Sequence, residues 1–171
     1  MIIRKETNSD YPAVYALIKE AFQSAEHSDG TEQDLVVSLR SSRAFIPELS
    51  LVAEINGRIA GHILFTKAAV GSRPVLALAP LSVKPEFQRQ GIGSALIRKG
   101  HAVAASLGYS HVIVLGSDQY YPRFGYVPAA PLGVVIPDGI PPRYVMAAAL
   151  GGTTIPLSGP ITYAEEFGIS G

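Results

Sequence analysis

Two glycines, Gly91 and Gly93, lie between an apolar segment and the start of a helical one, and no other residues of this sequence are better suited to bind an anion. A Gly-x-Gly turn leaves backbone N–H groups uncovered, so a diphosphate can approach the main chain closely. The positive end of the following helix dipole adds to the attraction. We therefore predict a phosphorylated ligand at this turn.

The details of the turn exclude the two commonest nucleotide-binding motifs. A dinucleotide fingerprint requires a third glycine three residues after the second, and that position is Leu96. A Walker A loop requires Gly-Lys followed by Ser or Thr, a combination absent from the sequence. Glycines also serve ordinary turns without a ligand, so the turn alone does not establish a function.

A second motif with chemical potential is the run Tyr120-Tyr121-Pro122-Arg123-Phe124-Gly125-Tyr126. Tyr121 lies four residues before a Gly-aromatic pair. A phenol with a pKa near ~10 is protonated at neutral pH and suits a general acid. Two alternatives remain open: Tyr121 could be an amphipathic packing residue between strands, and the adjacent Tyr120 has the same chemistry.

Together and in this order, the two motifs resemble those of the GCN5-related N-acetyltransferases (GNAT family). The resemblance covers about residues 1–130, and the tyrosine run is similar to that of bacterial acetyltransferases of the YhbS type. It implies that Gln88-x-x-Gly91-x-Gly93 holds the diphosphate of acetyl-CoA. It also implies that Tyr121 returns a proton to the departing thiolate.

The resemblance further implies a set of residues that bind the cofactor. The family splays its fourth and fifth strands, and the pantetheine arm pairs with exposed strand backbone, here expected at Leu81 and Val83. The full expected set is Leu81, Ser82, Val83, Gln88, Arg89, Gln90, Gly91, Ile92, Gly93 and Ser94. Basic residues near the turn either meet cofactor phosphates or form a solvated surface: Lys84, Arg89, Arg98 and Lys99.

Periodicity and turn residues predict the elements that position these motifs. Asn56-Gly57, between two apolar segments, favours a two-residue type I′ hairpin. Pro80 cannot donate a ladder hydrogen bond, so a bulge or a lapse in pairing is expected there. The predicted order is strand 1–6, helix from residue 12, helix 31–40, strands 51–55, 58–65 and 75–83, helix 91–107, strand 111–115 and strand 144–150.

This order agrees with the fold that the resemblance implies. That fold is an α/β (α+β) domain with a mixed, mostly antiparallel central sheet of about six or seven strands, flanked by helices and splayed between strands 4 and 5. We expect one domain over residues 1–171, with residues 131–171 forming a C-terminal strand and an ordered tail.

Composition narrows the function classes. The 171 residues carry 14 basic and 14 acidic side chains, so no broad cationic field indicates nucleic acid or an anionic membrane surface. The absence of cysteine excludes a covalent cysteine intermediate and favours direct transfer. Early charges and the lack of a ~20-residue apolar run indicate neither export nor a membrane span, so a cytoplasmic protein is expected. No histidine spacing indicates a metal site.

The general base and the acceptor are harder to predict. Many family members use a carboxylate on the fourth strand, whereas residues 75–83 contain neither an acid nor a histidine, only Ser82. Glu26, His27 and Glu32, near the connection between the first two helices, are the expected acceptor-side residues. A solvated loop or helix-terminus electrostatics would also explain them. Glu54 and His62 are further candidate bases.

We therefore expect an acetyl-CoA-dependent N-acetyltransferase that acts on a primary amine of a small molecule or peptide. Two alternatives remain. One is an acyl-CoA-binding module without chemistry, and the other is an enzyme that transfers longer acyl chains or uses oxygen acceptors. The apolar C-terminal region permits a homodimer without requiring one.

Overall fold

The protein is built around one mixed sheet. The computed structural model describes residues 1–23, 25 and 28–169. Within that part of the chain the sheet has nine strands, in the order β1-β2-β3-β4-β5-β8-β6, and β9 pairs with β3 and β7. The strands are β1 (Ile2–Lys5), β2 (Phe45–Ile55), β3 (Arg58–Val70), β4 (Arg73–Val83), β5 (His111–Leu115), β6 (Val127–Pro128), β7 (Val134–Val135), β8 (Val145–Ala149) and β9 (Gly159–Thr162).

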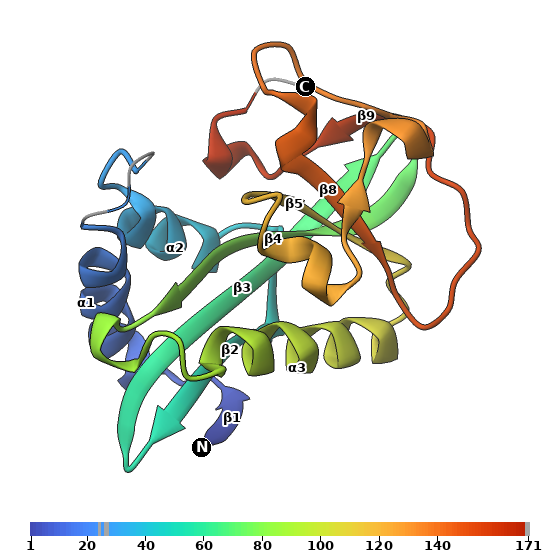
Figure 1. The fold of residues 1–171 in the computed structure, drawn as a ribbon. Coiled ribbons are helices and arrows are strands. Elements are labelled where there is room, and N and C mark those ends of the chain that lie inside the picture. The colour runs from blue at the N-terminus through green and yellow to red at the C-terminus, as the bar shows by residue number, and fades with distance from the viewer. Residues whose placement is uncertain (24, 26–27, 170–171) are drawn as a thin grey trace.

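Helices cover both faces of this sheet (Figure 1). Helix α3 (Ile92–Ser106) packs on one face, in the apolar cluster that contains Leu96 and Ile97. Helices α1 (Tyr11–Phe22) and α2 (Glu32–Arg40) pack on the other face, against Val52 and Leu64. Figure 1 shows the C-terminal segments beside β4 and β5, away from α1. The sheet therefore has an α3 face and an α1–α2 face.

The predicted hairpin between β2 and β3 is confirmed. Asn56 has φ 50° and Gly57 has φ 78°, so both turn residues adopt the left-handed conformation that a type I′ turn requires. Ile55 and Arg58 form the last pair before the turn. The hairpin fixes the register of the two longest strands and thereby the position of the centre of the sheet.

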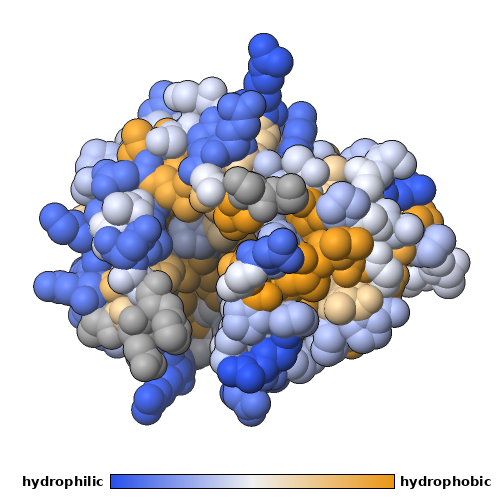
Figure 2. All heavy atoms as spheres, turned by 90° about the horizontal axis from the view of Figure 1, so that it is seen from above, coloured by the Kyte–Doolittle hydropathy of each residue, from blue (hydrophilic) through white to orange (hydrophobic). Residues whose placement is uncertain are grey.

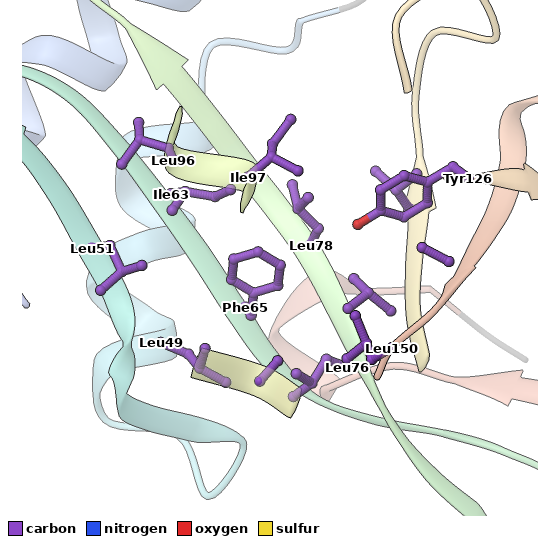
Figure 3. Packing of buried hydrophobic residues seen from close by; sticks show 14 of the residues in the cluster. Leu49, Leu51, Ile63, Phe65, Leu76, Leu78, Leu96, Ile97, Tyr126 and Leu150 are labelled. Atoms are coloured by element: carbon purple, nitrogen blue, oxygen red, sulfur yellow. The ribbon is translucent and has the colours of Figure 1, made fainter. Parts of the chain in front are cut away.

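A close approach between α3 and the sheet sets the position of the glycine turn. Phe65 on β3 is fully buried among leucine and isoleucine side chains (Figure 3). A Cβ on Gly100 would lie only 2.3 Å from Cε2 of Phe65. Since any larger residue would push the helix away, Gly100 lets α3 lie against this ring, and the start of α3 is held beside the end of β4.

The strands β4 and β5 separate as predicted. They are parallel and pair over only three residues, from Leu76–Val112 to Leu78–Val114. On the other side of β4, the pairing with β3 passes from Phe65–Leu78 to Ile63–Leu81, so β4 carries an extra residue at 79–80. The expected bulge at Pro80 is confirmed, and β4 continues past it without β5 beside it.

The number of strands exceeds the predicted six or seven. The additional strands lie in the proline-rich C-terminal region, where β6 and β7 have two residues each and β9 has four. Segments this short show no readable alternation of polar and apolar residues. β9 pairs with the end of β3, which attaches the tail to the sheet, and Ile161 within it is fully buried. Among the described residues, no helix combines the length and the apolar character needed to cross a bilayer.

Candidate functional site

An open cleft lies where β4 ends and α3 begins. Its volume is about 680 Å³. Three segments form it: the end of β4, the glycine turn with the first residues of α3, and the 3₁₀ turn η3 (Tyr121–Phe124) with the residue before it. The described residues that line it are Leu81, Val83, Phe87, Gln88, Arg89, Gly91, Ile92, Gly93, Ser94, Tyr120 and Arg123.

The glycine turn leaves space and donors for an anion. Gly91 is the N-cap of α3 with φ 83°, and no atom lies within 4 Å of the place where its Cβ would be. The first N–H groups of an α-helix have no acceptor within the helix, so they are available to a ligand, and the helix dipole makes this end positive. The residues at this turn fit a phosphorylated group such as the diphosphate of coenzyme A.

The two tyrosines of the second motif occupy different places. The Tyr120 hydroxyl lies against Gly93, where a Cβ would be 2.7 Å from it. The Tyr121 ring lies against Gly116, the residue directly after β5, where a Cβ would be 2.5 Å from Cε2 of the ring. Tyr120 thus lines the cleft near the glycine turn, whereas Tyr121 is not among the residues that line it and lies near the point where β4 and β5 part.

Packing holds the tyrosine segment against α3. Tyr126 is buried, and its hydroxyl lies 2.8 Å from Nε2 of His101 on α3. The rings of Tyr121 and Tyr126 meet edge to face, with centroids 5.5 Å apart. Burial raises the pKa of Tyr121 and, to a smaller extent, the pKa of Tyr120. Both phenols are therefore protonated at neutral pH, and burial makes each a weaker acid than a phenol in water.

Most of the expected cofactor residues come together in the cleft. Eight of the ten line it; the two exceptions are Ser82 and Gln90. The Ser82 side chain is buried and lies opposite His62 on β3, on the α1–α2 face. The Gln90 amide donates to the carbonyl of Glu86 at 3.4 Å. Sequence reasoning missed Phe87 and Arg123 as cleft residues, although Arg123 stands within the second motif.

The structure does not bring the acceptor-side residues into this cleft. Glu26 and His27 lie outside the described residues. Glu32 accepts a hydrogen bond from the Ser28 hydroxyl and lines a separate hollow of about 440 Å³. That hollow also contains three other acidic side chains, those of Asp29, Asp34 and Glu166.

The other candidate bases also lie away from the cleft. Glu54 lies 3.6 Å from the Arg4 guanidinium. His62 is fully buried, 3.1 Å from the Ser50 hydroxyl and 3.8 Å from the Glu6 carboxylate. Burial lowers the pKa of His62 to about 4, so it is a weak base at neutral pH. Among the described residues that line the cleft, none is a carboxylate or a histidine.

An open mixed sheet that splits between β4 and β5, with a glycine turn at the start of the next helix, is the architecture of acetyl-CoA-dependent acetyltransferases. A family model described as acetyltransferase (GNAT) family matches residues 11–126. The chain belongs to this family. The resemblance inferred from the two motifs is therefore confirmed.

Two relatives from Escherichia coli K12 are similar in sequence. YjhQ, an uncharacterized N-acetyltransferase, is 45% identical over 103 residues, which cover 58% of this chain and 57% of YjhQ. The match thus spans little more than half the length of that relative. YhbS, also an uncharacterized N-acetyltransferase, is 32% identical over 133 residues, which cover 76% of this chain and 75% of YhbS.

Solved structures extend the similarity to the whole fold. A GNAT family acetyltransferase from Brucella melitensis, solved in complex with acetyl-CoA, is 32% identical with a TM-score of 0.81, and the match covers 97% of each chain. The Escherichia coli YhbS structure, solved in complex with CoA, is 27% identical with a TM-score of 0.85 and matches over 99% of this chain and 93% of that one.

Proposed function

We propose that this protein is an acetyl-CoA-dependent N-acetyltransferase that moves the acetyl group directly to a primary amine of a small molecule or peptide. The observation that carries the proposal is the uncovered turn at Gly91, which opens into a cleft beside the unpaired end of β4. The acetyl-CoA and CoA complexes of the two solved relatives support the same cofactor. When bound, acetyl-CoA supplies the activated acetyl group as a thioester.

In this proposal the N–H groups at the start of α3 bind the diphosphate, and the cofactor arm follows β4 toward the split between β4 and β5. Leu81 and Val83 support this path, because their side chains lie 3.8 Å from the Cβ position of Gly93 and their strand has lost its β5 neighbour. Their main-chain groups would pair with the amides of the arm.

We assign the general acid to Tyr121 rather than Tyr120. The reactive sulfur is at the end of the cofactor arm that lies farthest from the diphosphate. Tyr120 lies beside Gly93, at the diphosphate end, whereas Tyr121 lies beside Gly116, just beyond the last β4–β5 pair. Burial raises the pKa of Tyr121, so its hydroxyl keeps its proton at neutral pH; in this proposal that proton passes to the departing thiolate when the thioester is cleaved.

The acceptor amine is proposed to enter from the α1–α2 side. Seen from above, the surface between that side and the C-terminal segments is hollowed and largely apolar (Figure 2). Glu32 and its acidic neighbours would attract a cationic amine toward this side by their field. Glu26 and His27, which lie outside the described residues, are also proposed as acceptor-binding residues. We also propose that the chain from residue 131 on belongs to the same domain, supported by the pairing of β9 with β3.

A second candidate function is acyl-CoA binding without chemistry. The lack of a carboxylate or histidine in the described lining of the cleft favours it, since a protonated amine must lose a proton before it attacks. An enzyme could satisfy this need through residues on the acceptor side or by taking the neutral fraction of the amine.

Calorimetric titration with acetyl-CoA, with dephospho-CoA and NAD as controls, tests the cofactor. We expect acetyl-CoA to bind selectively. Release of the CoA thiol is then measured with each amine of a panel. This assay distinguishes the two functions, because only an enzyme releases CoA in an amine-dependent way. Absence of acetyl-CoA binding in a folded sample would contradict both candidates.

A further inference from the structure

Arg123 lines the proposed cofactor cleft, and its guanidinium lies over the ring of another lining residue, Tyr120. Arg4, Arg40 and Arg58 each lie within 4.0 Å of a carboxylate. In the part of the chain that the structure describes, Arg123 has no such ion pair and no side-chain hydrogen bond; its guanidinium lies over the ring of Tyr120, 5.5 Å from the centroid. A guanidinium that stacks on an aromatic ring keeps its N–H donors free for another partner.

The position of Arg123 is fixed by its neighbours. Tyr120, over whose ring the Arg123 guanidinium lies, is held against Gly93 in the first turn of α3. The segment begins with Pro122 in the first turn of η3 and ends at Gly125, which has φ 88°. This geometry holds Arg123 in the lining of the cleft that the N-terminus of α3 also forms, rather than on a free loop.

The charge of the cleft is one-sided. Among the described lining residues the only charged ones are Arg89, on the glycine turn, and Arg123, on η3. Since no described carboxylate of the lining balances these two positive charges, both would attract an anion bound in the cleft. Arginine also suits phosphate better than lysine does, because its planar donors match two phosphate oxygens.

We propose that Arg123 is a cofactor-binding residue that donates to the diphosphate of acetyl-CoA from η3, beside the glycine turn. This inference rests on the proposed cofactor and adds a side-chain contact to the backbone donors of α3. It also gives the run Tyr120–Phe124 a second role: the same short turn that presents Tyr121 to the sulfur holds the phosphate end of the cofactor, which aligns the two ends with each other.

The matched variants are Arg123→Gln and Arg98→Gln. Arg98 is an exposed arginine on α3 that also stacks on an aromatic ring, that of Phe124 at 5.3 Å, but it does not line the cleft. Both variants should fold, because both side chains are on the surface, and melting temperatures check this. Titrations with acetyl-CoA, acetyl-dephospho-CoA and acetyl-pantetheine then show which phosphate Arg123 contacts. The second ligand lacks the 3′-phosphate, and the third lacks every phosphate.

We expect Arg123→Gln to lower the affinities for acetyl-CoA and acetyl-dephospho-CoA by about fivefold each, as for the loss of one partly exposed charge-assisted hydrogen bond. The affinity for acetyl-pantetheine should not change. Arg98→Gln should leave all three affinities unchanged. If Arg123→Gln binds acetyl-CoA as the wild type does, the inference is wrong while the proposed function stands. A loss confined to acetyl-CoA would overturn the assignment to the diphosphate. If the wild type binds no acetyl-CoA, the proposed function fails, and this inference fails with it.

Discussion

The two faces of the central sheet differ in how they are built. The α3 face has an apolar core around Phe65 and ends in a cleft lined by the glycine turn at the start of α3. The α1–α2 face has a buried polar network, in which Arg40 makes two 3.0 Å bonds to Glu6 and the Ser50 hydroxyl donates to Glu6 at 2.6 Å. In the proposed function, cofactor binding on the first face therefore depends on a local motif, whereas acceptor attraction on the second depends on side chains from distant segments.

The largest expected effect separates the two tyrosines on the cofactor side. Tyr121→Phe removes the proposed proton donor and keeps the ring, so kcat should fall by about 100-fold while acetyl-CoA affinity stays within about twofold. Steady-state kinetics with titration of acetyl-CoA measures both quantities.

Tyr120→Phe is the matched control, since it removes a neighbouring hydroxyl that lies against Gly93 rather than near the strand split. It should change kcat much less. A larger fall in kcat for Tyr120→Phe than for Tyr121→Phe would move the general acid one residue and break the division of the cleft into a phosphate end and a sulfur end.

The backbone of the glycine turn, the central hairpin and the end of β4 could be predicted from the sequence because the signals are local. The Gly91-x-Gly93 turn, the Asn56-Gly57 hairpin and the bulge at Pro80 each depend on residues whose backbone preferences are strong. Arg123 was not predicted as a cleft residue, because the fold, and not the local sequence, brings η3 beside the ends of β4 and α3. For the same reason the hollow at Glu32 could not be predicted. Glu32 and Glu166 both line it although 134 positions in the chain separate them. Short strands such as β6 and β7 could not be predicted, because two residues carry no periodicity.

The next effect concerns stability on the α1–α2 face. Glu6→Gln removes one charge of a pair in which the Arg40 side chain is 10% exposed and the Glu6 side chain 3%. The buried guanidinium would lose its counter-charge, so the free energy of unfolding should fall by about 3 kcal/mol in urea denaturation.

Glu86→Gln is the control for this change, because Glu86 pairs with Arg58 and Lys84 but is 51% exposed. Solvent screens such exposed pairs, so the urea midpoint of Glu86→Gln should stay close to that of the wild type. Equal stability losses in both variants would mean that the polar network is not what distinguishes the α1–α2 face.

A smaller effect tests whether the cofactor side depends on backbone geometry. Gly91 and Gly108 lie at opposite ends of α3, both have positive φ (83° and 92°), and no atom lies within 4 Å of either Cβ position. Replacement of either one by Val should therefore cost a similar backbone strain, roughly 1–2 kcal/mol. Only Gly91→Val should lower the affinity for acetyl-CoA, by about tenfold, because the valine side chain covers the N–H donors at the turn. Equal affinities for the two variants in a calorimetric titration would show that the turn does not bind the diphosphate.

The smallest expected effect lies on the acceptor side. If Glu32 attracts the amine only through its field, Glu32→Gln should raise KM for a cationic amine by about twofold and leave kcat and acetyl-CoA affinity unchanged. The difference should vanish at high salt, since screening removes long-range attraction between exposed charges. A neutral amine serves as the control substrate and should show no change at any salt concentration. A drop in kcat that persists at high salt would instead give Glu32 a direct part in the transfer, and the α1–α2 face would then contribute chemistry as well as attraction.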